Sequence, residues 1–172
     1  MPADAVRALL DERAIRETLF RYCRGVDRMD RALARACWHE GGSADYRGMF
    51  EGGADALLDW MWKLHEQMET HSHQITNLVI ELDGDRAVSE SYVTVVLRTK
   101  AGRAPARDIW SRGRYLDRWS RRDGRWAIDH RLFLNDWATS LPAGEEPGAP
   151  TSGRRDGSDP SYAAFAELRG RS

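Results

Sequence analysis

The sequence has few of the residues and motifs that mark familiar protein classes. Its 172 residues include only two cysteines, Cys23 and Cys37, which are too few for a disulfide framework and lack the spacing of a zinc site. It contains no P-loop, GxGxxG or GxSxG motif, so nucleotide binding and serine-hydrolase chemistry have no support. The 26 basic residues balance the 27 acidic ones, so no overall field would attract nucleic acid or an anionic membrane.

Long apolar runs are also absent. The opening stretch MPADAVRALLDERAIRE carries charged residues within its first turns, unlike a signal peptide or a membrane span. A hydrophobic content of 41% in a chain of this length is enough for the core of one ordinary domain. We therefore expect a single-domain cytoplasmic protein with no membrane or nucleic-acid partner.

The apolar pattern predicts helices first and strands afterwards. Apolar residues at three-and-four spacing, typical of amphipathic helices, mark the segments 3–27, 30–39 and 54–68. Runs rich in β-branched and aromatic residues predict a short strand near 43–50 and long strands over 73–82, 87–99, 108–122 and 125–139. This order indicates an α+β domain in which three N-terminal helices pack on a strongly curved antiparallel sheet.

The C-terminal part has a different composition. The stretch PAGEEPGAPTSGRRDGSDP cannot bury a core, so we predict a domain over 1–140 and a flexible Pro/Gly-rich tail over 141–172. Within this tail, SYAAFAELRG can form one or two helical turns. These turns are either a frayed end or a flap whose Tyr162 and Phe165 cover the mouth of a pocket.

The stretch ETHSHQITNLVIEL places two histidines at the start of a predicted strand. His71 and His73 are two residues apart, so both side chains project to one face, as a pair of metal ligands would. In a regular strand Glu81 would share that face at a distance, and His39 or His65 could add a further ligand, but nothing in the sequence brings these residues close. We expect no metal.

The other interpretation is that one histidine acts as a general base. Such a base needs a partner on one ring nitrogen to fix its tautomer and stabilise its charged form. Asp27 is a candidate, because it ends the first helix, where the macrodipole favours a basic residue. The alternative for Asp27 is a solvent-facing turn residue with no role in a site. The alternative for nearby Tyr22 is a residue that only packs in the core.

Several segments together resemble a known superfamily. The order GVDRMD, ADYRG, HSHQITN and YLDRWSRRDGRWAIDHR is similar to the SnoaL-like group of the nuclear transport factor 2-like superfamily, over roughly residues 5–137. That group includes scytalone dehydratase, bile-acid dehydratase and hexachlorocyclohexane dehydrochlorinase. The resemblance implies a cone-shaped α+β barrel, a bent sheet around a long helix, with an apolar pocket open at one end.

The resemblance also implies roles for individual residues. Asp27 in GVDRMD matches the family aspartate that orients a histidine, and His73 matches that histidine, the base that removes a proton from carbon. Tyr22 matches a tyrosine of the bile-acid enzyme, and Tyr46 matches a tyrosine that helps to polarise the substrate carbonyl in scytalone dehydratase. Arg131 matches an arginine of the bile-acid and dehydrochlorinase sites. On this assignment, replacing His71 would have little effect if that side chain lies outside the pocket.

Some positions depart from the pattern. In a regular strand the neighbours His130 and Arg131 point to opposite faces, so they cannot both face the pocket. We assign Arg131 to the pocket. The segment 90–97 lacks the second histidine of scytalone dehydratase, and Gly113 and Tyr115 replace its polar serine and asparagine. The same substrate is therefore not expected.

These features predict a cofactor-independent lyase or isomerase. Asp27 and His73 would abstract a proton from a small hydrophobic cyclic or aromatic substrate, as in polyketide or steroid metabolism. The expected pocket walls are aromatic: Trp38, Trp62, Tyr92, Trp110 and Tyr115. We expect a homodimer or homotrimer. The alternatives are a non-catalytic module that binds a small molecule or serves in assembly, and the small subunit of an aromatic-ring dioxygenase with an iron-bearing partner.

Overall fold

The computed structural model describes residues 3–102, 104–144 and 153–170. Its helices are α1 (Ala3–Asp27), α2 (Arg31–Arg35), α3 (Ala54–His65) and α4 (Pro160–Arg169). Its strands are β1 (Trp38–Asp45), β2 (Glu51–Gly53), β3 (Met68–Asp83), β4 (Arg86–Thr99), β5 (Arg107–Arg122) and β6 (Arg125–Pro142). The predicted α+β class is confirmed.

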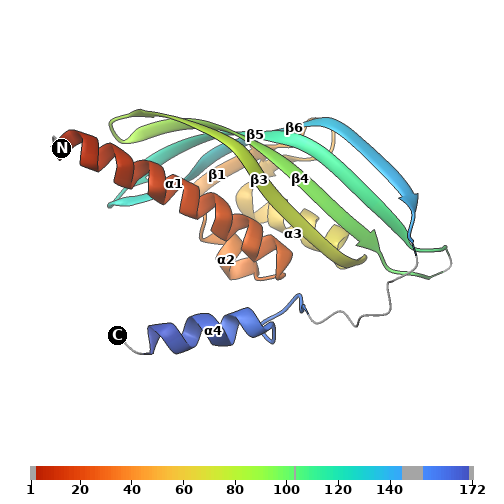
Figure 1. Cartoon of the computed structure of the whole chain (residues 1–172). Coiled ribbons are helices and arrows are strands. Elements are labelled where there is room, and N and C mark those ends of the chain that lie inside the picture. The colour runs from red at the N-terminus through yellow and green to blue at the C-terminus, as the bar shows by residue number, and fades with distance from the viewer. Residues whose placement is uncertain (1–2, 103, 145–152, 171–172) are drawn as a thin grey trace.

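The six strands form one curved, unclosed sheet in the order β2-β1-β6-β5-β4-β3, and α1, α2 and α3 lie on one of its faces (Figure 1). Strands β3 to β6 form the expected antiparallel meander. The pair β1 and β6 is parallel, so the expectation of an antiparallel sheet is wrong for this one pair. A parallel pair needs a long connection, and most of the sheet lies between β1 and β6 along the chain.

Two predicted helix ends are wrong. Helix α2 ends at Arg35 rather than at His39, because the chain joins the sheet from Cys37 onward, where the Cys37 carbonyl accepts a hydrogen bond from the N–H of Ile128 (3.0 Å). Helix α3 ends before Met68, which already belongs to β3. In both places pairing within the sheet overrides a local helical pattern.

A close contact between α1 and α2 fixes the end of α1. A Cβ atom at Gly25 would lie 2.6 Å from the backbone nitrogen of Ala34, so only glycine fits there. Beyond the helix end, Met29 has a left-handed φ of 52°, and the N–H of Asp30 donates to the Gly25 carbonyl (2.8 Å). This turn holds Asp27 at the end of α1, beside the edge strand β3.

A bulge in β3 exchanges the faces of its residues. Asn77, with a φ of 45°, lies where two residues of β3 stand opposite one residue of β4. Side chains alternate along a strand, so the extra residue reverses the pattern beyond it. The expectation that Glu81 shares a face with His71 and His73 is therefore wrong: Glu81 borders a surface hollow beside exposed Val88, whereas His71 is buried.

The core fills the space between the helices and the sheet. Ile15, Leu19 and Val26 of α1 are fully buried, and they face a sheet surface that includes the buried side chains of Trp119 and Ile128. None of the helices in the described parts of the chain is long and apolar enough to cross a membrane.

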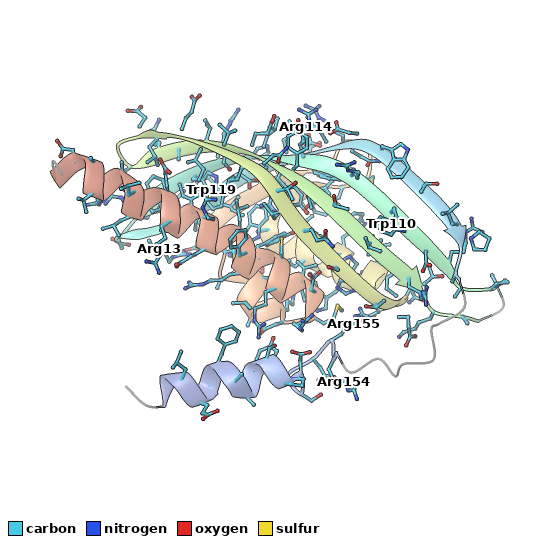
Figure 2. All side chains as sticks on the ribbon, in the orientation of Figure 1. Arg13, Trp110, Arg114, Trp119, Arg154 and Arg155 are labelled. Atoms are coloured by element: carbon cyan, nitrogen blue, oxygen red, sulfur yellow. The ribbon has the colours of Figure 1, made fainter. Side chains whose placement is uncertain are left out.

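The C-terminal segment returns to the end of α1. Helix α4 coincides with the stretch expected to form helical turns, and the Tyr162 hydroxyl donates to the carboxylate of Asp30 (2.9 Å). The guanidinium of Arg24 lies over the rings of Tyr162 and Phe165, at 4.8 and 5.0 Å from their centroids. Arg155 lies near the end of α3 (Figure 2). The rest of the predicted mobile stretch, residues 145–152, lies outside the described residues.

Candidate active site

Asp27 and His73 form a hydrogen-bonded pair. The Nδ1–H of His73 donates to Oδ1 of Asp27 (2.7 Å), and the backbone N–H of His73 donates to both carboxylate oxygens, at 3.1 and 3.0 Å. The side chains are 4% exposed for His73 and 14% for Asp27. Because Nδ1 carries the hydrogen, Nε2 presents its lone pair, and it has no hydrogen-bond partner among the described residues.

The fold explains why these two residues meet. Strand β3 is an edge strand, so the backbone N–H of His73 on its outer side has no partner strand. Asp27 at the end of α1 supplies the missing acceptor and binds the His73 ring at the same time. An acid at a helix C-terminus, which is unfavourable by itself, is thus used to complete the edge of a sheet and to orient an imidazole.

A small hollow opens beside this pair. It has a volume of about 300 Å³ and is lined by Phe20, Cys23, Arg24, Asp27, Arg28, His73 and Ile75. We call it the dyad hollow. Its lining mixes apolar side chains with two arginines, unlike the apolar pocket that the family resemblance implies. A larger hollow of about 710 Å³ lies at the ends of the β3–β4 and β5–β6 hairpins and includes neither Asp27 nor His73.

Two further histidines lie next to His73. The ring of His71 is 4.2 Å from that of His65 at the end of α3, and the His65 ring is 5.8 Å from that of His73. Burial lowers the pKa of His65 to about 2 and that of His71 to about 4, and the charge of Arg155 acts in the same direction. No group of three ligand-type side chains within the described segments has the geometry of a metal site.

A second polar cluster lies deeper in the core. Arg131 and Asp117 are fully buried and form a two-point ion pair, with N–O distances of 2.7 and 2.8 Å. The guanidinium carbon of Arg131 lies 3.8 Å from the ring centroid of Tyr115 and 4.4 Å from that of Tyr22. Burial disfavours the charge of Arg131, but the attraction of Asp117 outweighs it and keeps the pKa of Arg131 well above its ordinary value. Its buried Nη1 has no hydrogen-bond partner in the described parts of the chain.

A pair of tyrosines lies beside the Arg131 cluster and reaches α3. The hydroxyls of Tyr22 and Tyr46 lie 3.4 Å apart, and the Tyr22 hydroxyl is 3.4 Å from the sulfur of Met61. Burial raises the pKa of both tyrosines, so both hydroxyls remain neutral donors at ordinary pH. Met61 and His65 are separated by about one turn of α3, roughly 5.4 Å, and both are buried.

The other predicted site residues divide into two sets. Trp38 and Tyr115 are buried and lie against Arg131, and Trp62 is partly buried against the core. Tyr92 and Trp110, by contrast, are 39% and 44% exposed and lie on the sheet face that points away from the helices. They are therefore not walls of an interior pocket. Their strands alternate, and it is their neighbours in sequence that point inward.

Asp117 was not among the predicted site residues. In β5 it stands directly opposite Arg131 of β6, and both side chains point inward. The one available signal was an acidic residue among inward-facing aromatic ones in YLDRW. Arg131, which was assigned to the pocket in preference to His130, is buried beside Asp117 and does not line the dyad hollow, whereas His130 is bonded to Ser43 (2.9 Å).

Comparison with known proteins connects this arrangement to one family. The family model described as SnoaL-like domain matches residues 7–132. A proposed scytalone dehydratase from Novosphingobium aromaticivorans is 23% identical, with a TM-score of 0.70, and covers 84% of this chain and 97% of its own. The LinA-type3 hexachlorocyclohexane dehydrochlorinase from Novosphingobium barchaimii is 21% identical, with a TM-score of 0.73 over 85% of this chain and 99% of its own.

A third similar structure is a proposed aromatic ring hydroxylase from Novosphingobium aromaticivorans, which is 21% identical with a TM-score of 0.69 over 77% of this chain and 94% of its own. At these identities the solved structures establish the fold alone. No curated protein sequence matches the chain.

Proposed function

The chain belongs to the family of SnoaL-like domains, and from that premise we propose that it is a cofactor-independent lyase or isomerase that removes a proton from carbon. The observation that carries this proposal is the 2.7 Å bond between the Asp27 carboxylate and Nδ1 of His73. It leaves Nε2 of His73 as the free acceptor nitrogen. Dehydratases and dehydrochlorinases among the relatives support the reaction class.

In this proposal His73 is the general base. Asp27 fixes the tautomer that presents Nε2 to the substrate and stabilises the imidazolium that forms when the proton is taken. General-base catalysis of this kind typically contributes about a hundred-fold to ten-thousand-fold in rate. The protonated His73 then returns the proton to a leaving group in an elimination, or to another carbon in an isomerisation.

The deeper cluster would stabilise the negative charge that develops on the substrate. A carbonyl next to the acidic carbon becomes an enolate, and donors aimed at its oxygen lower the barrier. Tyr22 and Tyr46 provide neutral hydroxyls, and Arg131 keeps one buried N–H group unpaired among the described residues. We therefore propose a small hydrophobic cyclic or aromatic carbonyl or hydroxy compound as substrate.

Proton exchange provides a direct test of this proposal. Hydroxylated cyclic ketones and halogenated rings would be incubated with the protein in D₂O, and NMR would follow both deuterium uptake, which reports reversible proton abstraction or isomerisation, and loss of the leaving group, which reports elimination. We expect one of the two reactions with at least one compound, lowered about a hundred-fold or more by Asp27→Asn or His73→Asn. Asp59→Asn is the matched control, because Asp59 is an exposed residue of α3 paired with Arg31.

The competing function is a non-catalytic module that binds a small molecule. It predicts binding of such compounds without deuterium uptake, and affinities that Asp27→Asn leaves unchanged. Uptake that survives both Asp27→Asn and His73→Asn would remove the pair from the mechanism. A subunit of an aromatic-ring dioxygenase would instead copurify with a large iron-containing partner.

A further inference from the structure

His71 makes a hydrogen bond that bears directly on Asp27. Its Nε2–H donates to the carbonyl oxygen of Val26 (2.9 Å), which also accepts from the N–H of Met29 (3.1 Å). The Val26 carbonyl belongs to the peptide unit that links Val26 to Asp27. Holding that carbonyl fixes the plane of the peptide, and with it the direction in which the Asp27 side chain leaves the backbone.

The same strand therefore holds Asp27 at two points. His71 binds the backbone before Asp27, and His73 binds its carboxylate through a ring nitrogen and a backbone N–H. Because His71 and His73 alternate with a single residue between them, both point to the same side of β3. Because both histidines belong to β3, these bonds fix the position of the end of α1 relative to His73, the proposed base.

The position of His71 is itself well determined. The residue is 4% exposed, and its ring lies 4.2 Å from that of His65 at an angle of 35°. The backbone of His65 is held in turn by Arg155, whose guanidinium donates to the His65 carbonyl (2.6 Å). His71 does not line the dyad hollow, but its hydrogen bond to the peptide before Asp27 gives it an effect on the site that the expectation of a silent replacement did not consider.

We propose that His71 is a positioning residue that holds Asp27 in contact with His73. The effect of His71 on catalysis rests on the proposed function. Its effect on the contact between Asp27 and His73 can be measured without any substrate. His71 does not act as the base, since its Nε2–H donates to the Val26 carbonyl and its other ring nitrogen, Nδ1, is buried away from the dyad hollow. It contributes by keeping the carboxylate within reach of Nδ1 of His73.

Two isosteric variants separate this role from simple filling of the core. The amide nitrogen of glutamine reaches as far as Nε2 of histidine and can donate to Val26, whereas that of asparagine reaches only as far as Nδ1. Both residues are polar and uncharged. We therefore expect His71→Gln to preserve the arrangement and His71→Asn to loosen it, with melting temperatures recorded for each to confirm that it folds.

NMR supplies the structural readout. Long-range ¹H–¹⁵N spectra report which ring nitrogen of His73 carries the hydrogen, and amide exchange reports on its backbone N–H, which donates to Asp27 at the sheet edge. We expect the Nδ1–H tautomer and slow exchange in the wild type and in His71→Gln. In His71→Asn we expect a mixed tautomer and amide exchange faster by about tenfold or more. A tautomer and an exchange rate that His71→Asn leaves at wild-type values would overturn the inference.

The kinetic readout applies if the proton-exchange assay shows turnover. A misplacement of about 1 Å costs roughly a hundred-fold in rate, so His71→Asn should lower kcat by up to this factor with KM little changed, and His71→Gln should restore most of it. Absence of turnover in the wild type would refute the proposed function and leave the NMR result standing. Turnover with identical His73 spectra in all variants would refute only the role of His71.

Discussion

Acidification should destabilise the folded protein through two buried histidines, His71 and His65, whose pKa values are lowered by burial. The pKa of His71 falls from 6.5 to about 4 in the folded state, and that of His65 falls from 6.5 to about 2, because burial disfavours the charged rings. The unfolded chain therefore binds more protons than the folded chain below about pH 6.5. Stability from these groups is present above pH 6.5 and is lost as the pH falls toward the folded-state values.

The size of the effect follows from linkage. A histidine with a pKa near 4 when folded and 6.5 when unfolded lowers the free energy of unfolding by about 2 kcal/mol between pH 7 and pH 5. His65 contributes a similar amount over this interval, so the two together account for roughly 4 kcal/mol if they act independently. Carboxylates whose pKa is lowered contribute to the pH dependence only at lower pH; Asp159, whose pKa is held well below its ordinary value by the hydrogen bond from the Ser161 hydroxyl, is one of them. The window between pH 7 and pH 5 is therefore left largely to the histidines.

Denaturant unfolding tests this directly, with the fluorescence of the seven tryptophans as the signal. Free energies of unfolding would be measured at pH 7, 6 and 5 for the wild type, His71→Gln and His65→Gln. We expect each variant to lose about 2 kcal/mol less than the wild type over this interval. A wild-type change below about 0.5 kcal/mol, or equal pH slopes in all three proteins, would refute the reasoning.

Three further predictions concern other parts of the molecule. Asp117→Ala leaves the charge of Arg131 buried and unpaired, so we expect the free energy of unfolding, measured with denaturant, to fall by about 3–5 kcal/mol. Replacing both residues with apolar ones should lower it clearly less. Equal losses would contradict the ion-pair account. Gly25→Ala brings a Cβ atom against the backbone of Ala34, which predicts a loss of about 1–3 kcal/mol, and an unchanged melting temperature would show that the two helices can move apart. The exposed Trp110 lies on a sheet face of mixed charge that can pair with itself, so we propose that the chain forms a homodimer or homotrimer through this face; analytical ultracentrifugation should show an oligomer that Trp110→Glu dissociates, and a monomeric wild type would refute the proposal.

The candidate pair was accessible from the sequence because its signals are local. Asp27 is an acid where a helix end favours a base, and His73 opens a stretch of β-branched residues that predicts a strand. The resemblance to SnoaL-like proteins connected the two across the chain. The alternation of inward and outward residues likewise placed Arg131 in the interior, because regular strand geometry depends on sequence position alone.

Only the tertiary structure decided the features that depend on register and contact. Counting back from the Asp123-Gly124 turn pairs Asp117 with His130, but a bulge in the hairpin shifts the register and brings Asp117 opposite Arg131. The bulge at Asn77 turned Glu81 to the outer face in the same way.

The contacts of His71 with Val26 and His65 have no sequence signal at all, because they join three elements far apart in the chain. The sequence alone thus determined the residue types, the periodicities and the family. The packing of α1 along the unpaired edge of β3 determined which of those residues meet, because an interatomic distance depends on every register and bulge between the two atoms.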